Sequence, residues 1–175
     1  MSHRNSARPD ASWHSNSSVK RRQILLAGAG ALTVALAGCT GNNDDDDNGP
    51  PDPADDPEGF IDFYLDDFDA NLYDGTFEDL TGQETVTMEY GTNGPDWATE
   101  PPAARISTGT TVTWEWVSDG HSLEQEDGTV NFVEETGVED EGHTHEFTFD
   151  EAGVLVYFCR PHRGVGHWGG LIIEE

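Results

Sequence analysis

The sequence predicts an all-β domain, a sandwich or barrel of short strands, preceded by an export signal and an acidic tether. From residue 83 onward, apolar and polar residues alternate with period two in six short runs, as expected of strands. The runs cover residues 84–90, 104–108, 111–117, 143–149, 154–159 and 170–175. Turn sequences such as STGTT (107–111) and DEAG (150–153) separate neighbouring runs. A spacing of roughly ten residues is typical of a β-sandwich or barrel, so we assign residues 83–175 to one domain.

The first 39 residues indicate an export signal. The pair Arg21-Arg22 resembles the twin-arginine export signal, and residues 24–37 form an apolar run that is too short to span a bilayer comfortably. The sequence LAGC, which ends at Cys39, resembles a lipobox, in which this cysteine becomes the lipidated N-terminus. We therefore expect an exported protein with a lipid anchor at the outer face of the cell membrane. The alternative is an ordinary cleaved signal whose cysteine is incidental.

Two segments separate the signal from the β domain. Residues 40–59 are acidic, proline-rich and low in complexity, so we expect a disordered, self-repelling tether. Residues 60–82 begin with aromatic side chains at near-helical spacing. These aromatic residues are Phe60, Phe63, Tyr64 and Phe68. We expect this extension to form a short helix or turn that packs on the main domain.

The net charge of −27 is distributed unevenly along the chain. Residues 1–38 contain five of the eight basic residues, whereas the chain from Cys39 onward has 34 acidic residues, three arginines and a net charge of −31. Such a surface excludes nucleic acid as a partner, because nothing on it could neutralise phosphates. The alternating apolar runs argue against a wholly disordered acidic chain. Molar salt shortens the Debye length to about 3 Å, so we expect a folded domain from a salt-loving organism.

One cysteine and several histidines are candidate metal ligands. Cys159 and His162 stand three residues apart after an apolar run, and Pro161 pre-sets the turn between them. If Cys39 is lipidated, Cys159 has no partner for a disulfide. His121, which follows another strand-like run, can reach this pair if both loops lie at the same pole of a sandwich. One thiolate and two imidazoles make the ligand set of blue copper electron-transfer sites, whereas three histidines and one cysteine also suit structural zinc.

Two longer segments carry a family resemblance. DWATEPPAARISTGTTVTWEWVSDGH (96–121) and FDEAGVLVYFCRPH (149–162) resemble the corresponding segments of halocyanin-type cupredoxins in the plastocyanin family. The signal, the tether and YLDDFDANLYDGTFEDLTGQ (64–83) extend the resemblance over nearly the whole chain. The resemblance implies a Greek-key cupredoxin fold and one copper ion that alternates between Cu(I) and Cu(II). It also implies a one-electron carrier rather than an enzyme, with a quinol-oxidising complex or a terminal oxidase as redox partner.

The resemblance assigns equatorial copper ligation to His121, Cys159 and His162, but the chain departs from the family at two positions. His167 stands where the family has an axial methionine, and Ser122 stands where the family usually has an asparagine that ties the two ligand loops together. A coordinating His167 would favour Cu(II), lower the reduction potential and shift the colour from blue toward green or red. The alternative is that His167 turns into solvent and leaves a three-coordinate site. We expect the shorter Ser122 to tie the loops less well.

Further residues and functions have more than one interpretation. The resemblance implies an apolar docking surface for the redox partner at Val165 and Trp168, although Trp168 is equally expected in the core. His143 and His145 share one face of their predicted strand, a spacing that fits either a metal site or ordinary strand residues. Two other functions stay open. One is a tetragonal copper centre with a position accessible to a small molecule, and the other is a zinc-binding or copper-storage module.

Overall fold

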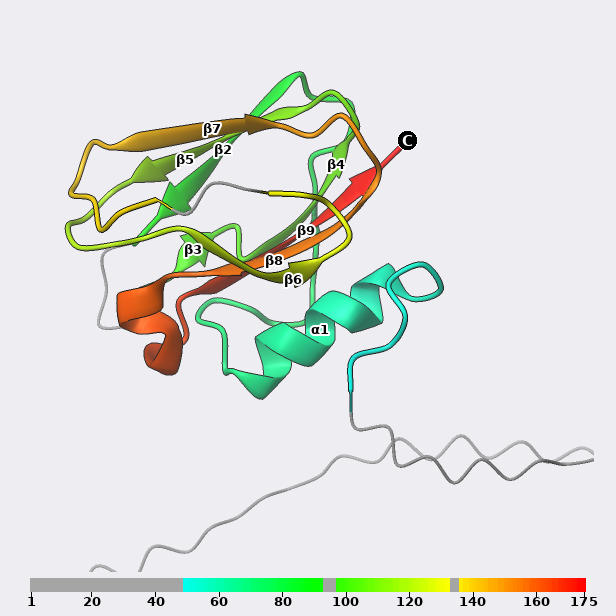
Figure 1. The fold of residues 1–175 in the computed structure, drawn as a ribbon, viewed down its shortest axis with the longest axis horizontal. Coiled ribbons are helices and arrows are strands. Elements are labelled where there is room, and N and C mark those ends of the chain that lie inside the picture. Colours follow the sequence, from blue (N-terminus) through cyan, green and yellow to red (C-terminus); the bar gives the residue numbers. More distant parts are fainter. Residues whose placement is uncertain (1–48, 93–96, 133–135) are drawn as a thin grey trace, which may run out of the picture. The chain divides into compact units, whose positions relative to one another are not determined.

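Two β-sheets packed face to face form the body of the described chain, and one helix lies on the outside (Figure 1). The computed structural model describes residues 49–92, 97–132 and 136–175. In chain order the elements are α1 (Pro57–Asp67), β1 (Glu78–Asp79), β2 (Thr85–Tyr90), β3 (Thr99–Glu100), β4 (Ala103–Ser107), β5 (Thr111–Trp116), β6 (Glu124–Gly128), β7 (Thr144–Thr148), β8 (Gly153–Phe158), the 3-10 helix η1 (Arg160–Val165) and β9 (Trp168–Glu174). Within the described residues, one sheet has the strand order β1-β4-β9-β8-β6 and the other β3-β2-β5-β7. The predicted β-sandwich is confirmed.

Strict alternation along β2 and β5 builds the inner core. In β2, Val86, Met88 and Tyr90 are buried, and the residues between them are exposed. β5 pairs with β2 in parallel and places Trp114 opposite Met88 and Trp116 opposite Tyr90. The aromatic core therefore extends to the pole of the sandwich where both strands end.

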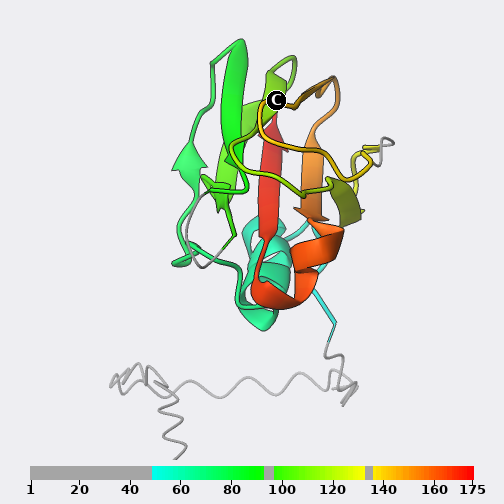
Figure 2. The ribbon, with the colours of Figure 1, turned by 90° about the vertical axis from the view of Figure 1, so that its left-hand side faces the viewer.

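The two central strands of the larger sheet, β8 and β9, are buried on both faces. In β8, Leu155 and Tyr157 face the core between the sheets. Val154, Val156 and Phe158 belong to a second core, which lies under α1. Figures 1 and 2 show α1 alongside β8 and β9 on the outer side of this sheet. Burial on both faces explains why the sequence of β8 is apolar throughout rather than alternating.

Short-range signals in the sequence define the start of α1. The Asp56 side chain accepts a hydrogen bond from the Gly59 backbone N–H at 2.9 Å, and Pro57 occupies the first helical turn. Ile61 is fully buried against Gly170 of β9, where an added Cβ would lie 2.4 Å from the Ile61 side chain. The helix thus approaches the sheet at a distance that only glycine permits.

Several predicted boundaries need correction. The tether predicted for residues 40–59 ends early, because α1 begins at Pro57. The short strands β1, β3 and β6 were not predicted; β6 is an edge strand of almost wholly polar sequence that pairs with β8. β9 begins two residues before the predicted run because Trp168 pairs with Phe158 of β8.

The export signal predicted for residues 1–39 and residues 40–48 of the predicted tether lie outside the described residues. No helix among residues 49–92, 97–132 and 136–175 is both long and apolar enough to cross a membrane.

Candidate metal centre

Four potential metal ligands meet at the pole of the sandwich where β5 and β8 end. They are His121, Cys159, His162 and His167, and one ligand atom of each lies within 4.8 Å of the others. His121 comes from the loop after β5, and the other three come from the loop between β8 and β9. The structure therefore brings together all four residues that the sequence proposed as ligands.

Two of the imidazoles face the thiol through the same ring atom. The Cys159 Sγ atom lies 3.6 Å from His121 Nδ1 and 3.4 Å from His162 Nδ1. The two Nδ1 atoms are 3.1 Å apart. One thiolate and two imidazoles that converge in this way form a chelating set for one soft or borderline metal ion.

The loop from Cys159 to His167 is closed by its own backbone hydrogen bonds. The Cys159 N–H donates to the His167 carbonyl at 3.0 Å, the His162 N–H to the Cys159 carbonyl at 3.0 Å, and the His167 N–H to the His162 carbonyl at 3.2 Å. Pro161 lies in the first turn of η1, and Gly166 ends η1 with a left-handed φ of 87°. Local sequence thus holds three candidate ligands in one rigid turn.

A serine fixes the orientation of the first imidazole. His121 Nε2 lies 2.8 Å from the Ser118 hydroxyl, which itself donates to the Gly91 carbonyl. The hydroxyl must therefore accept a hydrogen bond from Nε2–H, so the lone pair of His121 is on Nδ1 and faces the thiol. Gly91 (φ 82°) leaves room for this contact, because a Cβ there would lie 2.4 Å from His121 Nε2.

The core holds the backbone on either side of the first ligand. The Trp116 indole N–H donates to the His121 carbonyl at 2.9 Å, and the Tyr90 hydroxyl donates to the Ser122 carbonyl at 2.8 Å. Both aromatic side chains are buried residues of the alternating strands. Two residues that build the core therefore also position the ligand loop.

Ser122 connects the two ligand loops with the help of a buried carboxylate. Its hydroxyl accepts a hydrogen bond from the Arg160 backbone N–H at 3.1 Å and donates to Glu124 at 3.0 Å. The Arg160 guanidinium also binds Glu124, at 2.9 and 2.5 Å. The role of Glu124 was not predicted, because only the folded chain shows that β6 places this residue beside the loop.

His167 is buried with no hydrogen-bond partner for either ring nitrogen within the described chain. Its ring packs against Tyr90 at 4.3 Å between centroids. Burial, followed by the neighbouring His121 and His162, lowers the pKa of His167 to about 2, so this imidazole is neutral. The expected alternative, in which His167 turns into solvent, is wrong for this structure. A buried imidazole whose lone pair is unused fits a metal ion at this position.

The other candidate ligands also favour the uncharged state in the metal-free protein. Burial, with a smaller effect of His162, lowers the pKa of His121 to about 4. Burial also lowers the pKa of His162 and raises the pKa of the Cys159 thiol. Metal binding to the thiolate must therefore release a proton.

Two other histidines and the predicted docking residues lie differently from expectation. His143 packs against Trp116, and His145 packs beside Trp114; neither belongs to the four-residue cluster. Trp168 is fully buried, so it cannot contact a partner directly, and the docking role expected for it is wrong.

Two apolar residues beside the cluster reach the surface: Val165 is exposed and Trp97 is half-buried. Val165 is 53 % exposed, as a docking residue should be. Trp97, whose ring stacks on His162 at 4.4 Å between centroids, was not predicted as a site residue. Nothing in the sequence marked Trp97 apart from its being an aromatic residue just before β3.

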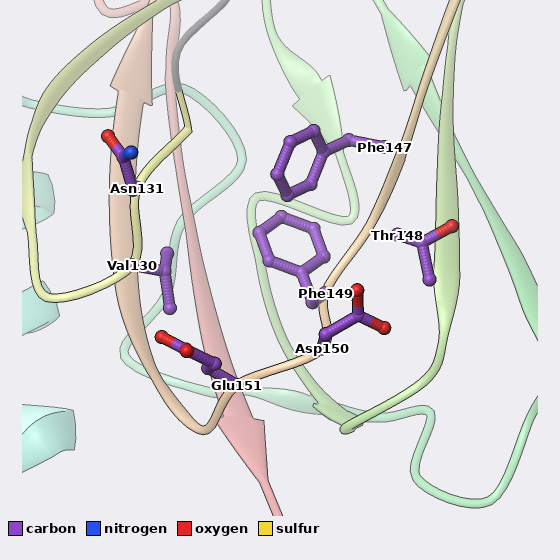
Figure 3. Close-up of a pocket in the computed structure, with 7 residues that line it drawn as sticks. All are labelled: Val130, Asn131, Phe147, Thr148, Phe149, Asp150 and Glu151. Atoms are coloured by element: carbon purple, nitrogen blue, oxygen red, sulfur yellow. The ribbon is translucent and has the colours of Figure 1, made fainter.

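A hollow of about 320 Å³ lies at the opposite end of β8 from the four ligands (Figure 3). Figure 3 shows Val130 near the rings of Phe147 and Phe149, with Asp150 and Glu151 at the side. It has neither the sulfur nor the imidazole ligands that characterise the candidate metal centre.

Known proteins resemble the chain over the region that contains this cluster. The model of the copper-binding proteins of the plastocyanin/azurin family matches residues 86–174. Halocyanin from Natronomonas pharaonis is 44% identical over 158 residues, which cover 89% of this chain and 97% of that protein. Plastocyanin from Scenedesmus fuscus is 28% identical over 97 residues, 51% of this chain and 99% of that protein. A pseudoazurin structure from Methylobacterium extorquens AM1 matches with a TM-score of 0.44 and 19% identity, covering 52% of this chain and 76% of that one.

Replacing Ser118 with alanine removes the hydroxyl that fixes the His121 tautomer. Because loss of such an outer hydrogen bond typically weakens metal binding about 10- to 100-fold, we expect a loss of copper affinity in this range, measured by chelator competition. Ser107→Ala is the control, since the Ser107 hydroxyl only accepts a hydrogen bond from Gly82 N–H at the start of the domain. Equal affinities of the two variants would contradict the role of Ser118.

The metal-free protein should lose stability as the pH falls below about 6.5, the ordinary pKa of histidine. Between that value and the lowered pKa in the fold, the unfolded chain binds a proton that the folded chain excludes, so protonation favours unfolding. Each such group contributes a slope of about 1.4 kcal/mol per pH unit. Denaturant unfolding between pH 6 and 4 should therefore show a shallower pH dependence for His167→Met than for the wild type. Parallel curves would show that His167 is protonated in the fold.

Proposed function

Because this chain belongs to the plastocyanin/azurin family of copper-binding proteins, we propose that the four side chains of the candidate metal centre hold its one copper ion. The protein binds copper and carries electrons; it is not an enzyme. When bound, copper supplies a one-electron couple between Cu(I) and Cu(II). The observation that carries the ligand assignment is the buried His167, both of whose ring nitrogens have no protein partner in the described chain.

Three of the ligands form the equatorial set in this proposal. His121 and His162 present Nδ1 to the Cys159 sulfur, and the hydrogen bonds around them fix both loops before metal binds. Fixed ligands limit the rearrangement that accompanies a change of oxidation state, which favours rapid electron transfer. The burial of His121, Cys159 and His167 argues against the alternative of a position open to small molecules. Membership in a copper-binding family argues against the zinc alternative.

His167 takes the fourth position in place of a thioether. An imidazole is a harder and stronger donor than a methionine sulfur, so it favours Cu(II) over Cu(I). For a one-electron couple, each tenfold gain in affinity for Cu(II) relative to Cu(I) lowers the reduction potential by about 59 mV. We therefore propose a carrier of lower potential than a methionine-ligated relative.

Electrons leave through His162, the least buried of the four ligands. No acidic residue occurs between residues 152 and 173, and the two arginines of the loop are paired with glutamates. The loop that carries three of the ligands, together with its ion-pair partners, therefore adds no net charge to a chain whose net charge is −27. A redox protein partner can approach it without charge repulsion, and Val165 and Trp97 offer apolar contact. The family resemblance suggests a quinol-oxidising complex or a terminal oxidase as this partner.

The proposed location is the outer face of the cell membrane. The arginine pair at residues 21–22, the short apolar run at 24–37 and the lipobox-like LAGC support export and lipid attachment at Cys39. The excess of acidic residues supports a high-salt environment.

Spectra of the copper-loaded protein in high salt test the ligand assignment. If His167 coordinates, the wild type should show a green or red thiolate charge-transfer spectrum with wide copper hyperfine splitting in EPR, and His167→Met should turn blue with narrow splitting. A blue wild type that His167→Met leaves unchanged would remove His167 from the ligand set. Absence of any thiolate band would overturn ligation by Cys159.

Membrane fractionation tests the location. Cys39→Ala should move the exported protein from the membrane fraction to the soluble fraction, because the acyl chains have no other attachment point in the lipobox. Asn48→Ala, a change in the tether, is the control and should stay with the membrane. A soluble wild type would sink the lipid-anchor proposal.

A further inference from the structure

We propose that the segment of residues 57–73 supports the metal centre through Phe68 and Asn71, and that Asn71 is a positioning residue that keeps Trp97 stacked on His162. The inference rests on the proposed function in one respect, that His162 is a copper ligand. Residues 57–73 lie before the region matched by the family model, residues 86–174. Their effect on the site follows from contacts within this chain.

The helix places the segment beside the ligand loop. α1 packs on β8 and β9 through a buried face that includes Ile61 and Leu65 (Figures 1 and 2). At its C-terminal end, Phe68 stacks on Trp168 with centroids 4.4 Å apart and rings 8° from parallel. The Trp168 indole N–H in turn donates to the Arg163 carbonyl at 2.9 Å, one residue after a ligand. Phe68 and Trp168 thus connect the C-terminal end of α1 to the ligand loop.

Asn71 then joins three separate pieces of chain. Its backbone N–H donates to the Gly166 carbonyl at 2.8 Å. Its side-chain amide donates to the Val165 carbonyl at 2.7 Å and to the Trp97 carbonyl at 2.8 Å. Only a side-chain amide offers two N–H donors on one planar nitrogen at this reach. The residue therefore fixes the position of Trp97 relative to the ligand loop.

Trp97 covers the ligand that is most exposed. The indole and the His162 imidazole are 4.4 Å apart between centroids and 15° from parallel. A ring held flat against the imidazole limits its rotation and restricts the approach of water to that face. If Asn71 releases Trp97, the imidazole gains freedom to leave the metal.

The test uses Asn71→Asp, which preserves the shape of the side chain but cannot donate to either carbonyl. NMR of the metal-free protein measures the upfield ring-current shift that the stacked indole imposes on the His162 ring protons. We expect Trp97→Leu to abolish this shift and Asn71→Asp to reduce it. Tyr73→Phe is the matched control, because it removes the hydrogen bond from Tyr73 to Asp62 within the same segment and should leave the shift unchanged.

The copper-loaded protein supplies the second readout. Copper should pass to an excess of chelator about 5- to 10-fold faster from Asn71→Asp than from the wild type or Tyr73→Phe, with the thiolate band retained. Asn71→Ala should behave like Asn71→Asp and excludes an effect of the added charge.

Three outcomes overturn the inference. The first is an unchanged ring-current shift in both Asn71 variants, and the second is a Tyr73→Phe variant that changes the shift or the copper transfer as much as the Asn71 variants do. The third is failure of both Asn71 variants to fold while Tyr73→Phe folds. Loss of the thiolate band in the wild type would instead refute the proposed copper ligation by Cys159. The ring-current arm does not depend on that result, because it is measured without metal.

Discussion

The structure depends on burying polar ligands at one pole of an otherwise apolar sandwich. His121, Cys159 and His167 are removed from water, and His167 finds no hydrogen-bond partner in the described protein. Such burial is unfavourable unless each group finds a partner, and one metal ion at the point of convergence satisfies all of them together. The surrounding fold must therefore hold the ligands in place without metal, which the backbone closure of the loop and the donors Tyr90 and Trp116 accomplish.

β8 and β9, which are buried on both faces, hold the ligand loop between them in place. Alternate residues of β8 enter different cores, one between the sheets and one under α1. Cys159 directly follows this strand, so its position is set by packing on two sides. Trp168, at the start of β9, packs under the helix and bonds to the loop above it. Trp168, for which a docking position and a core position were equally expected, lies in the core and connects the N-terminal helix to the metal centre.

The acidic residues and the candidate ligands of the C-terminal part lie in different segments of the chain. Acidic residues are abundant over the rest of the chain from Cys39 onward, but the segment from residue 152 to residue 173, which carries three of the four candidate ligands, contains none of them. Arg160 and Arg163 are paired with Glu124 and Glu126, so they neutralise neighbouring acids rather than create a basic patch. In the proposed high-salt environment, salt would also suppress long-range steering, and short-range apolar contact would select the proposed partner.

The sequence by itself predicted the sandwich and the candidate ligands His121, Cys159 and His162, because period-two alternation and the spacing of Cys159 and His162 are local properties of the chain. The departure at His167 followed from the family resemblance. The edge strand β6 escaped prediction because its residues face water or ion partners and leave no alternating pattern. Only the tertiary structure decided that Trp168 is buried, that Trp97 covers His162, and that Asn71 joins Trp97 to the ligand loop. These relations connect residues far apart in the sequence, and they follow from which faces of the strands and helix pack together, which no local pattern encodes.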